Sequence, residues 1–597
     1  MILELGYYTL FTVIRKPKSG VPACIYHLYA LLDFCFYIVP HVSSMNLNLD
    51  IGSNTGDEVT WDIIRGWLDE CLEKHTRCNQ KNITDYVPSR LVKLNDTTGE
   101  PTFCVVEKCQ VDPQSPYLTL SHRWGESSQL RLKLTRSTSE RLSREQLCRT
   151  LPKTFRDASE VARRLKICYL WIDSLCIFQD SAEDWLKESS SMRDVYGNAF
   201  LNIAALGAED NHGGLFFSRN PSELKPTIFN FSVDGPEDPH LYRFDHDTGS
   251  ASWVGPILQR GWVLQERILS RRVLYFGSRQ VFWECYEITC SETHPKNFNQ
   301  YVYNKYDEKE QGQTRTEPNH HAWKALMGTD RLQPSCEDKL SQLFMDWYEI
   351  ARTYTTCDLT VSSDKLVALS GIAKDMKRRL TTLGCRDTKY LAGMWSQDLP
   401  YALMWSLNEF GRRPESYRAP SWSWAAVDGS SLMPFYGRTD LEALVSVTSA
   451  RTTLENDEDE TGKVRGGMLT LTGFLATANI GLSAENTYEQ ESNRRRIIDF
   501  RNHEDGTRLP KFNDYHYIFC SSACVLFDTK EIYPRVLCLP ITRGDRPAKF
   551  DLIWGLALVQ VGHENYRRVG LFSLHVNPGD SVQSIFTNAS QGSVNII

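Results

Sequence analysis

Residues 169–207 read YLWIDSLCIFQDSAEDWLKESSSMRDVYGNAFLNIAALG, and the fold class follows from this pattern. The first four residues are apolar or aromatic without alternation, which is typical of a strand covered on both faces. A helical pattern follows, in which Trp185, Met192 and Tyr196 are spaced by seven and four. The stretch therefore predicts a buried strand, a polar loop, a helix over 182–197 and a second buried strand.

The sequence before this stretch continues the alternation. YLTLS at 117–121 is another short, mostly apolar run, and residues 152–166 carry apolar side chains at helical spacing, with Pro152 in the first turn. A helix of this length between two buried strands is typical of a βαβ crossover. We therefore predict an α/β fold with a parallel, doubly wound sheet built on strands 117–121, 169–173 and 200–206.

Polar residues follow each predicted strand, at the position where open α/β sheets bind their ligands. The carboxyl ends of parallel strands meet at one edge of a sheet, so we expect these loops to converge. Each loop alone is also compatible with an ordinary turn, and Asp173 with a helix N-cap. The candidate ligand-binding residues are Ser121, His122, Arg123, Trp124 and Gly125 after the first strand, and Cys176 and Gln179 beside Asp173 after the second.

Two glutamates are candidates for acid/base chemistry. Glu188 falls about 60° from Trp185 around the predicted helix, at the margin of the buried stripe, where partial burial raises the pKa of a carboxyl group. A solvent-facing glutamate is the alternative. Glu266 lies among four arginines, an arrangement that is more often an ion-pair cluster. Trp185 and Glu266 complete the set of candidate ligand-binding residues.

A possible metal site precedes the first strand. Cys71, His75 and Cys78 are spaced by four and three residues on a predicted helix, which places them on one face and suggests zinc. The sequence offers no nearby fourth ligand with the usual paired spacing. We therefore favour a buried helical face and predict no metal.

Composition narrows the function classes. The net charge of -7 gives no general attraction for nucleic acid, and the 17 cysteines lack the dense spacing of a secreted disulfide scaffold. We expect reduced cysteines and a cytoplasmic location. Residues 21–42 are largely apolar and follow basic residues, but His27 and Asp33 interrupt them, so a membrane anchor is the less favoured interpretation.

Five regions are predicted along the chain. Residues 336–379 have helical periodicity, YLAGMWSQDLPYALMW at 390–405 is interpreted as a further helical segment, and residues 432–597 consist mainly of strand-like runs. The predicted regions are an apolar N-terminal extension at 1–50, a helix with short strands at 51–116, the α/β domain at 117–290, a linker and helical region at 291–430, and a β-rich domain at 431–597.

The motifs YLTLSHRWG, LPKTFRDASEVARRLKICYLWID, GGLFFSR and RGWVLQERILSRRVLYF, in this order, resemble the heterokaryon incompatibility (HET) domain of filamentous fungi over residues 117–285. His122 stands where a tyrosine is common in the family. The resemblance implies nonself recognition, in which the domain triggers cell death after incompatible hyphae fuse. It also implies distant kinship with TIR domains. The flavodoxin-like fold of TIR domains can either assemble with other copies or cleave NAD. By order along the chain, Glu188 corresponds to the glutamate that carries this cleavage.

Two functions remain open at this point. In the first, the chain is an NAD glycohydrolase with Glu188 and Asp173 as catalytic residues, NAD as substrate and no required cofactor. Loss of nicotinamide builds an oxocarbenium-like cation that a carboxylate stabilises. In the second, the domain is a non-catalytic module that acts by homo-oligomerisation or by binding an incompatibility partner protein. The sequence contains no Gly-rich dinucleotide fingerprint or P-loop, which disfavours a redox NAD enzyme and an NTPase.

Overall fold

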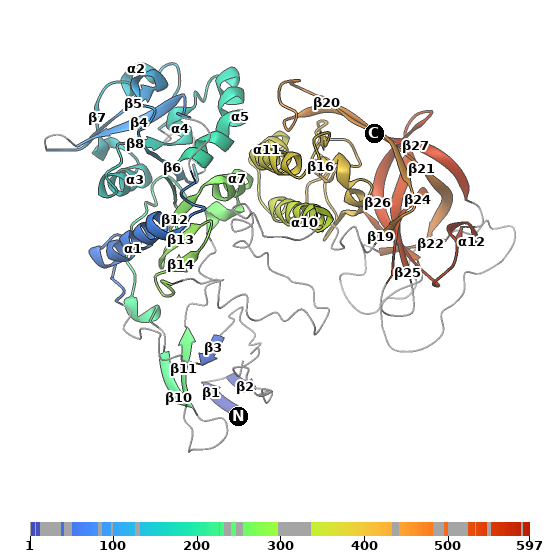
Figure 1. The fold of residues 1–597 in the computed structure, drawn as a ribbon, viewed down its shortest axis with the longest axis horizontal. Helices are drawn as coiled ribbons and strands as arrows, with labels where there is room; N and C mark the ends of the chain where they lie inside the picture. The colour runs from blue at the N-terminus through green and yellow to red at the C-terminus, as the bar shows by residue number, and fades with distance from the viewer. Residues whose placement is uncertain are drawn as a thin grey trace. The chain divides into compact units, whose positions relative to one another are not determined.

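The computed structural model divides the chain into two compact units, Met1–Thr329 and Asp330–Ile597 (Figure 1). The second unit therefore joins the predicted helical region and the predicted β-rich domain in one body. The structure describes residues 2–5, 8–11, 37–40, 50–80, 86–96, 99–125, 132–225, 227–231, 240–245, 255–296, 336–432, 441–481, 495–499, 523–531, 533–545, 551–586 and 589–597.

The first unit is built on a nine-stranded sheet with the order β14-β13-β12-β9-β6-β8-β4-β5-β7. Its four central strands run parallel, because β6 pairs with β8 and β9, and β9 pairs with β12. The predicted α/β fold is therefore confirmed. These strands are β6 (Tyr117–Ser121), β8 (Tyr169–Trp171), β9 (Leu201–Ala204) and β12 (Arg272–Phe276).

Strand β6 marks the point where the direction of winding reverses. The chain passes from β6 through α3 (Lys153–Arg164) to β8 on one side, and then through α5 (Ala182–Asn198) to β9 on the other. The order β8-β6-β9-β12 corresponds to 2-1-3-4, the order of flavodoxin-like sheets. Ligands of such sheets bind beyond the carboxyl ends of the strands at this switch point. The end of β6 is therefore where a site is expected.

The sheet as a whole is mixed, because strands that pair antiparallel flank the predicted parallel strands on both sides. Strands β4 and β5 pair antiparallel with each other, as do β12, β13 and β14 in turn. Short connections of this kind allow only antiparallel pairing, since a parallel crossover needs a dozen residues or more. The flanking strands are β4 (Arg90–Asn95), β5 (Thr102–Glu107), β7 (Gln146–Leu147), β13 (Val281–Cys285) and β14 (Thr289–Ser291).

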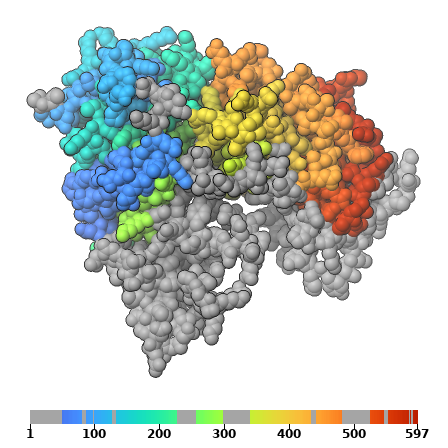
Figure 2. All heavy atoms as spheres, in the orientation of Figure 1, coloured from blue at the N-terminus to red at the C-terminus, as the bar shows by residue number. Residues whose placement is uncertain are grey.

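Helix α1 (Glu58–Lys74) packs against β13. Its N-cap is Asp57, whose carboxylate accepts the backbone N–H of Thr60 at 3.1 Å. The helix buries a stripe at spacings of three and four, while Leu72 is 42% exposed. The buried stripe consists of Trp61, Ile64, Trp67 and Cys71. The opposite face forms part of the molecular surface in the view of Figure 2.

The remaining helices of the first unit are short or lie beside the sheet. Helix α7 (Gly261–Leu269) precedes β12 and contacts α5. The other elements are α2 (Ser139–Leu142), α4 (Asp173–Cys176), and the strands β1 (Ile2–Leu5), β2 (Tyr8–Phe11), β3 (Tyr37–Pro40), β10 (Thr227–Phe231) and β11 (His240–Asp245).

The apolar segment at 21–42 lies outside the described residues except for β3, which pairs antiparallel with β11. Within the described part of the chain, none of the helices has the length and apolar character needed to cross a bilayer.

The second unit begins with two helices, α10 (Cys336–Thr355) and α11 (Val367–Thr382), as predicted. The helical interpretation of residues 390–405 is wrong. Tyr390–Leu391 (β15) and Met394–Trp395 (β16) form a small hairpin, followed by 3-10 turns. Ala392 and Gly393 have φ angles of 49° and 98° in its turn, a conformation that ends any helix.

The rest of the second unit is β-rich, as predicted. Its sheet has the order β19-β24-β25-β26-β23-β22-β21-β20, and a further pairing of β24 with β21 closes six of these strands into a ring. A pair of short strands, β17 (Ser406–Leu407) and β18 (Ser431–Leu432), precedes it. The remaining elements are β19 (Leu441–Ala443), β20 (Ser446–Leu454), β21 (Val464–Gly481), β22 (Arg495–Asp499), β23 (Ala523–Phe527), β24 (Arg535–Asp545), β25 (Asp551–Gln560), β26 (Asn565–Val576), α12 (Val582–Ile585) and β27 (Ser590–Ile596).

Candidate functional site

A buried polar cluster lies at the carboxyl end of β6. The hydroxyl of Ser121 donates a hydrogen bond to the carboxylate of Glu266 on α7, and it accepts one at 3.0 Å from Nδ2 of Asn202 on β9. Thr119 donates to Oδ1 of the same asparagine at 3.0 Å. Three elements that are distant in sequence therefore supply a connected hydrogen-bond network at the switch point.

Asp173 lies beside this network and is more open to solvent. Its side chain is 23% exposed, and Oδ2 accepts a hydrogen bond from the indole Nε1 of Trp124 at 2.9 Å. Oδ1 lies 3.8 Å from Nε2 of His122, whose ring is buried against the edge of Phe155. The loops after β6 and β8 thus meet as predicted. Of the two carboxylates, Asp173 and Glu266, Asp173 is the one more exposed to solvent.

Burial controls the charge of the cluster. Removal from water, with a smaller contribution from the nearby Asp173 carboxylate, raises the pKa of Glu266 to about 7, although Arg260 and the Ser121 hydroxyl oppose the rise. Burial also lowers the pKa of His122 below its usual value, against the attraction of Asp173. Glu266 is consequently only partly ionised near neutral pH, whereas His122 is neutral.

Gly125 closes the first loop in a conformation that requires glycine. Its φ angle is +77°, in the region that side-chain-bearing residues avoid. A Cβ added there would lie 2.7 Å from Cβ of Asp210, in the loop after β9. The carboxylate of Asp210 accepts the backbone N–H groups of His212 and Gly213 at 2.7 and 3.1 Å. The third loop therefore closes on itself and packs against the first.

Glu188 belongs to a separate cluster. It is 1% exposed, and its carboxylate lies 3.8 Å from the guanidinium of Arg90 on β4, which also forms an ion pair with Asp184. Burial raises the pKa of Glu188, while a hydrogen bond from Ser89 and the charge of Arg90 act in the opposite direction. The structure thus places this glutamate with Arg90 and Asp184, away from the hydrogen bonds that join Ser121 and Glu266.

The other predicted residues have varied surroundings. Gln179 donates from its amide to the backbone oxygens of Asp173 and Ile177, at 3.1 and 2.9 Å, so it holds the loop. Cys176 is fully buried, which raises the pKa of its thiol to about 12. The Trp185 ring makes an edge contact with Trp262 at 6.2 Å between centroids, and Arg123 is partly exposed.

Sequence reasoning missed three members of the cluster. Asn202 is a fully buried amide within an otherwise apolar strand, which is the signal that could have identified it. Tyr196 was assigned to the apolar stripe of its helix, yet burial and the nearby Glu266 raise the pKa of its phenol. Arg260, one of the four arginines near Glu266 in the sequence, donates from its guanidinium to the backbone oxygen of His122, and its charge also lowers the pKa of Glu266.

These features define an α/β domain with a flavodoxin-like order of parallel strands and a buried carboxyl cluster at the switch point. Comparison with known proteins identifies the family. Residues 117–266 match the family Heterokaryon incompatibility protein (HET), and this part of the chain is a HET domain. The expected resemblance is therefore confirmed, and the matched range contains β6, α3, β8, α5, β9 and the part of α7 up to Glu266.

One relative is heterokaryon incompatibility protein 6, OR allele, of Neurospora crassa. The two sequences are 27% identical over 132 residues, which represent 20% of this chain and 18% of the relative. The chain therefore matches less than a fifth of that protein's length. No solved structure matches the chain significantly.

Proposed function

We propose that this chain acts in fungal heterokaryon incompatibility, in which its HET domain triggers cell death after fusion of unlike hyphae. The domain match over 117–266 and the similarity to heterokaryon incompatibility protein 6 of Neurospora crassa support this role. The test is expression of the full chain in a filamentous fungus, followed by vital-dye staining of fusion cells. Death confined to fusions between unlike partners is the expected result, and normal heterokaryons at comparable protein levels would contradict it.

For the site, we propose cleavage of NAD at its nicotinamide–ribose bond. The observation that carries this proposal is the pair of carboxyl groups, Asp173 and Glu266, at the switch point of the sheet. In the reaction the C1′–N bond breaks, and its electron pair leaves with nicotinamide. Water then adds to C1′ and releases a proton, so that the products are nicotinamide and ADP-ribose.

We assign different roles to Asp173 and Glu266 because their exposure to solvent differs. Asp173, held by the Trp124 indole, is the carboxylate best placed to stabilise the ribosyl cation or to accept the ribose hydroxyls. Glu266 is 5% exposed and bonded to Ser121, so we assign it to orienting the loop after β6. Glu188, which corresponds to the catalytic glutamate of TIR domains, keeps its proposed catalytic role as a separately testable alternative.

Four variants of the purified full chain, two of them controls, separate these roles. Asp173→Asn should reduce NAD consumption at least 100-fold, since it removes a charge that acts on the cation. Glu188→Gln should have a comparable effect only if Glu188 is the catalytic group. Asp180→Asn and Glu183→Gln are matched controls, because both residues are exposed in or beside the same loop. Absence of NAD turnover by the wild-type chain in every oligomeric state would reject the enzymatic proposal.

A non-catalytic assembly module is the second candidate. The observation that favours it is the pairing of both buried glutamates within the fold, Glu188 with Arg90 and Glu266 with Ser121. Groups paired in this way usually stabilise a structure. In this case cell death should persist in Asp173→Asn and Glu188→Gln, and light scattering should show a change in oligomeric state on activation. Loss of death in Asp173→Asn with unchanged folding and oligomerisation would argue against it.

A further inference from the structure

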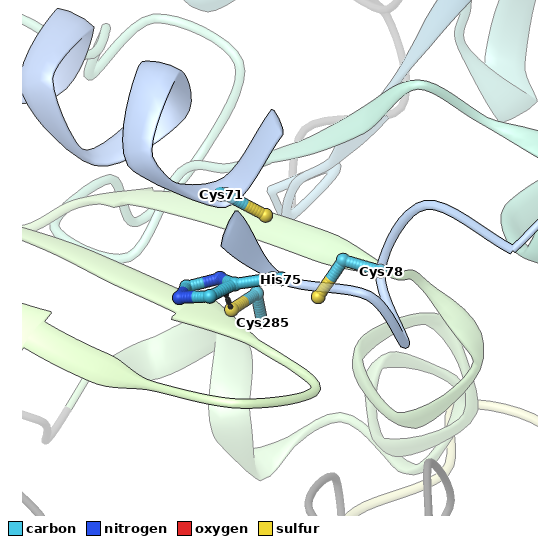
Figure 3. Close-up of side chains that lie close together, drawn as sticks. All are labelled: Cys71, His75, Cys78 and Cys285. Carbon is cyan, nitrogen blue, oxygen red and sulfur yellow. Dashed lines mark hydrogen bonds between the residues drawn. The ribbon is translucent and has the colours of Figure 1, made fainter. Parts of the chain in front are cut away.

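Four metal-binding side chains meet at the end of helix α1. Cys71, His75, Cys78 and Cys285 each direct one ligand atom into a common space, and these atoms all lie within 4.8 Å of one another (Figure 3). All four residues are buried, with exposures of 6% or less, and the three cysteines are free thiols. Such a set lies outside the polar cluster of the HET domain and has no part in the proposed reaction.

The fold brings these residues together from two distant segments. Cys71 is in the last turn of α1, His75 is its C-cap, and Cys78 follows in the next turn of the chain. Cys285 ends strand β13, 210 residues after His75. This separation is the reason the sequence pattern offered no fourth ligand. The prediction of a metal-free helical face rested on spacing within one helix, whereas the fourth ligand comes from the sheet beneath it.

The size of the cluster suits a tetrahedral zinc ion. Zinc binds thiolate sulfur at about 2.3 Å and imidazole nitrogen at about 2.0–2.1 Å, so neighbouring ligands in a tetrahedral site are roughly 3.5–3.8 Å apart. The Sγ atom of Cys285 lies 3.4 Å from Nδ1 of His75. Three thiolates and one imidazole are a common ligand set for structural zinc, and the soft sulfur ligands disfavour magnesium and calcium.

Hydrogen-bond donors lie beside two of the three sulfur atoms. Nε of Arg272 donates to Sγ of Cys71 at 3.1 Å, and the backbone N–H of Ile288 donates to Sγ of Cys285 at 3.4 Å. Three thiolates around Zn²⁺ carry a net charge of about -1, which the guanidinium of Arg272 offsets. Such outer hydrogen bonds orient the ligands of a metal site and adjust their basicity.

The two segments are also joined around the cluster. The amide of Asn79 donates to the backbone oxygens of Cys71 and His75, at 2.8 and 2.9 Å, which fixes the end of the helix. The backbone N–H of Arg77 donates to the Glu287 carboxylate at 2.8 Å, and thus links the loop of Cys78 to the turn that follows Cys285. The ligands are therefore held in place by contacts that do not involve the metal.

We propose that Cys71, His75, Cys78 and Cys285 bind one structural zinc ion. All four positions of the ion are filled by protein, so it has no open site for catalysis. The first three ligands precede the HET match at 117–266 and the fourth follows it. The ion therefore fastens α1 to β13 and joins the two chain segments that flank the domain.

The first test is the metal content of the full chain, purified without a metal-affinity step and analysed by mass spectrometry. We expect one zinc ion per chain. His75→Ala and Cys285→Ser should lower the zinc content to background, whereas His75→Cys, which supplies a fourth thiolate, should retain it. Cys148→Ser changes a buried cysteine outside the cluster and should leave the zinc content unchanged. A folded wild-type chain without stoichiometric zinc would overturn the proposal.

A second test does not depend on the variants being able to fold. Cobalt exchanged into the wild-type chain should give the intense sulfur-to-cobalt charge-transfer bands and the visible bands of a tetrahedral site. A strong chelator should lower the melting temperature of the wild type, and added zinc should restore it. Octahedral cobalt spectra, a disulfide among the three cysteines in the purified protein, or iron with inorganic sulfide in place of zinc would each overturn the proposal.

Discussion

The Ser121 hydroxyl donates a hydrogen bond to the Glu266 carboxylate and so joins the end of β6 to helix α7 across 145 residues of sequence. These residues lie at the beginning and the end of the matched HET region. The bond therefore links the first strand of the domain to its last helix. Because Glu266 is buried and has a raised pKa, the strength of this link depends on pH.

Glu266 should make the domain less stable as the pH rises. Burial raises its pKa to about 7 from the ordinary value of 4.5. The folded state therefore holds this proton more tightly, and the associated stability is fully present below the unfolded pKa and is lost as the pH rises through about 7. The loss amounts to ~3 kcal/mol. Glu266→Gln removes the ionisation, so its melting temperature relative to wild type should increase between about pH 5 and about pH 8.

The control for this pH series is Glu183→Gln, the same substitution at an exposed position of α5. Its melting temperature relative to wild type should change little over the same interval. An equal pH dependence in both variants would show that the effect does not arise from the buried carboxyl group.

Sequence patterns predicted the central sheet because each strand carries its own signal. YLTLS is mostly apolar and YLWI is apolar or aromatic throughout, and helices α3 and α5 have clear helical periodicity, so the alternation predicts a parallel arrangement. The antiparallel strands at the edges were harder to assign to this sheet, since pairing between β4 and β8 is a long-range contact. The hairpin at 390–395 was not predicted, because nothing in the local sequence indicates the positive φ of Ala392. The apolar residues of this segment are also compatible with a buried helix.

The sequence predicted which loops form the site, but it did not predict the hydrogen-bond and ion-pair partners of the site residues. Ser121 and Asp173 follow predicted strands, and their convergence follows from strand direction alone. The partner of each glutamate depends on tertiary packing, because Glu188 pairs with Arg90 on the distant strand β4, and Glu266 accepts a hydrogen bond from Ser121. The same limit applied to Cys285, because spacing rules detect ligands only when they are close in sequence.

Gly125→Ala should disturb the loop that carries Trp124. The substitution places a side chain at a φ of +77° and 2.7 Å from Cβ of Asp210, so the backbone must shift. We expect a loss of ~2 kcal/mol in the free energy of unfolding, from strain and contact together. Gly99→Ala is the matched control, because Gly99 has a φ of +105° but open space around it. Its loss should be nearer ~1 kcal/mol, and equal losses would exclude a contribution from Asp210.

Glu284→Ala should strongly destabilise the first unit. The carboxylate is fully buried and accepts two hydrogen bonds from Arg267, at 2.9 and 3.0 Å, as well as one from the Tyr275 hydroxyl. Its removal deprives a buried guanidinium of its carboxylate partner, which costs about 3–5 kcal/mol. Glu160→Ala breaks the pair with Arg163 on the surface of α3 and should cost less than ~1 kcal/mol. Similar melting temperatures for the two variants would contradict this assignment.

Gly66→Ala should stabilise helix α1 and leave its zinc ligands in place. Gly66 lies inside the helix on its exposed face, and a Cβ added there meets no atom within 4 Å. Alanine reduces the conformational entropy of the unfolded chain, so we expect a gain of about 0.5–1 kcal/mol and a higher melting temperature. Gly207→Ala should have the opposite effect, because its Cβ would lie 2.5 Å from the backbone nitrogen of Ser278. A lower melting temperature for Gly66→Ala would mean that α1 is not docked as described. An unchanged zinc content in this variant would show that the gain in stability comes from the helix itself.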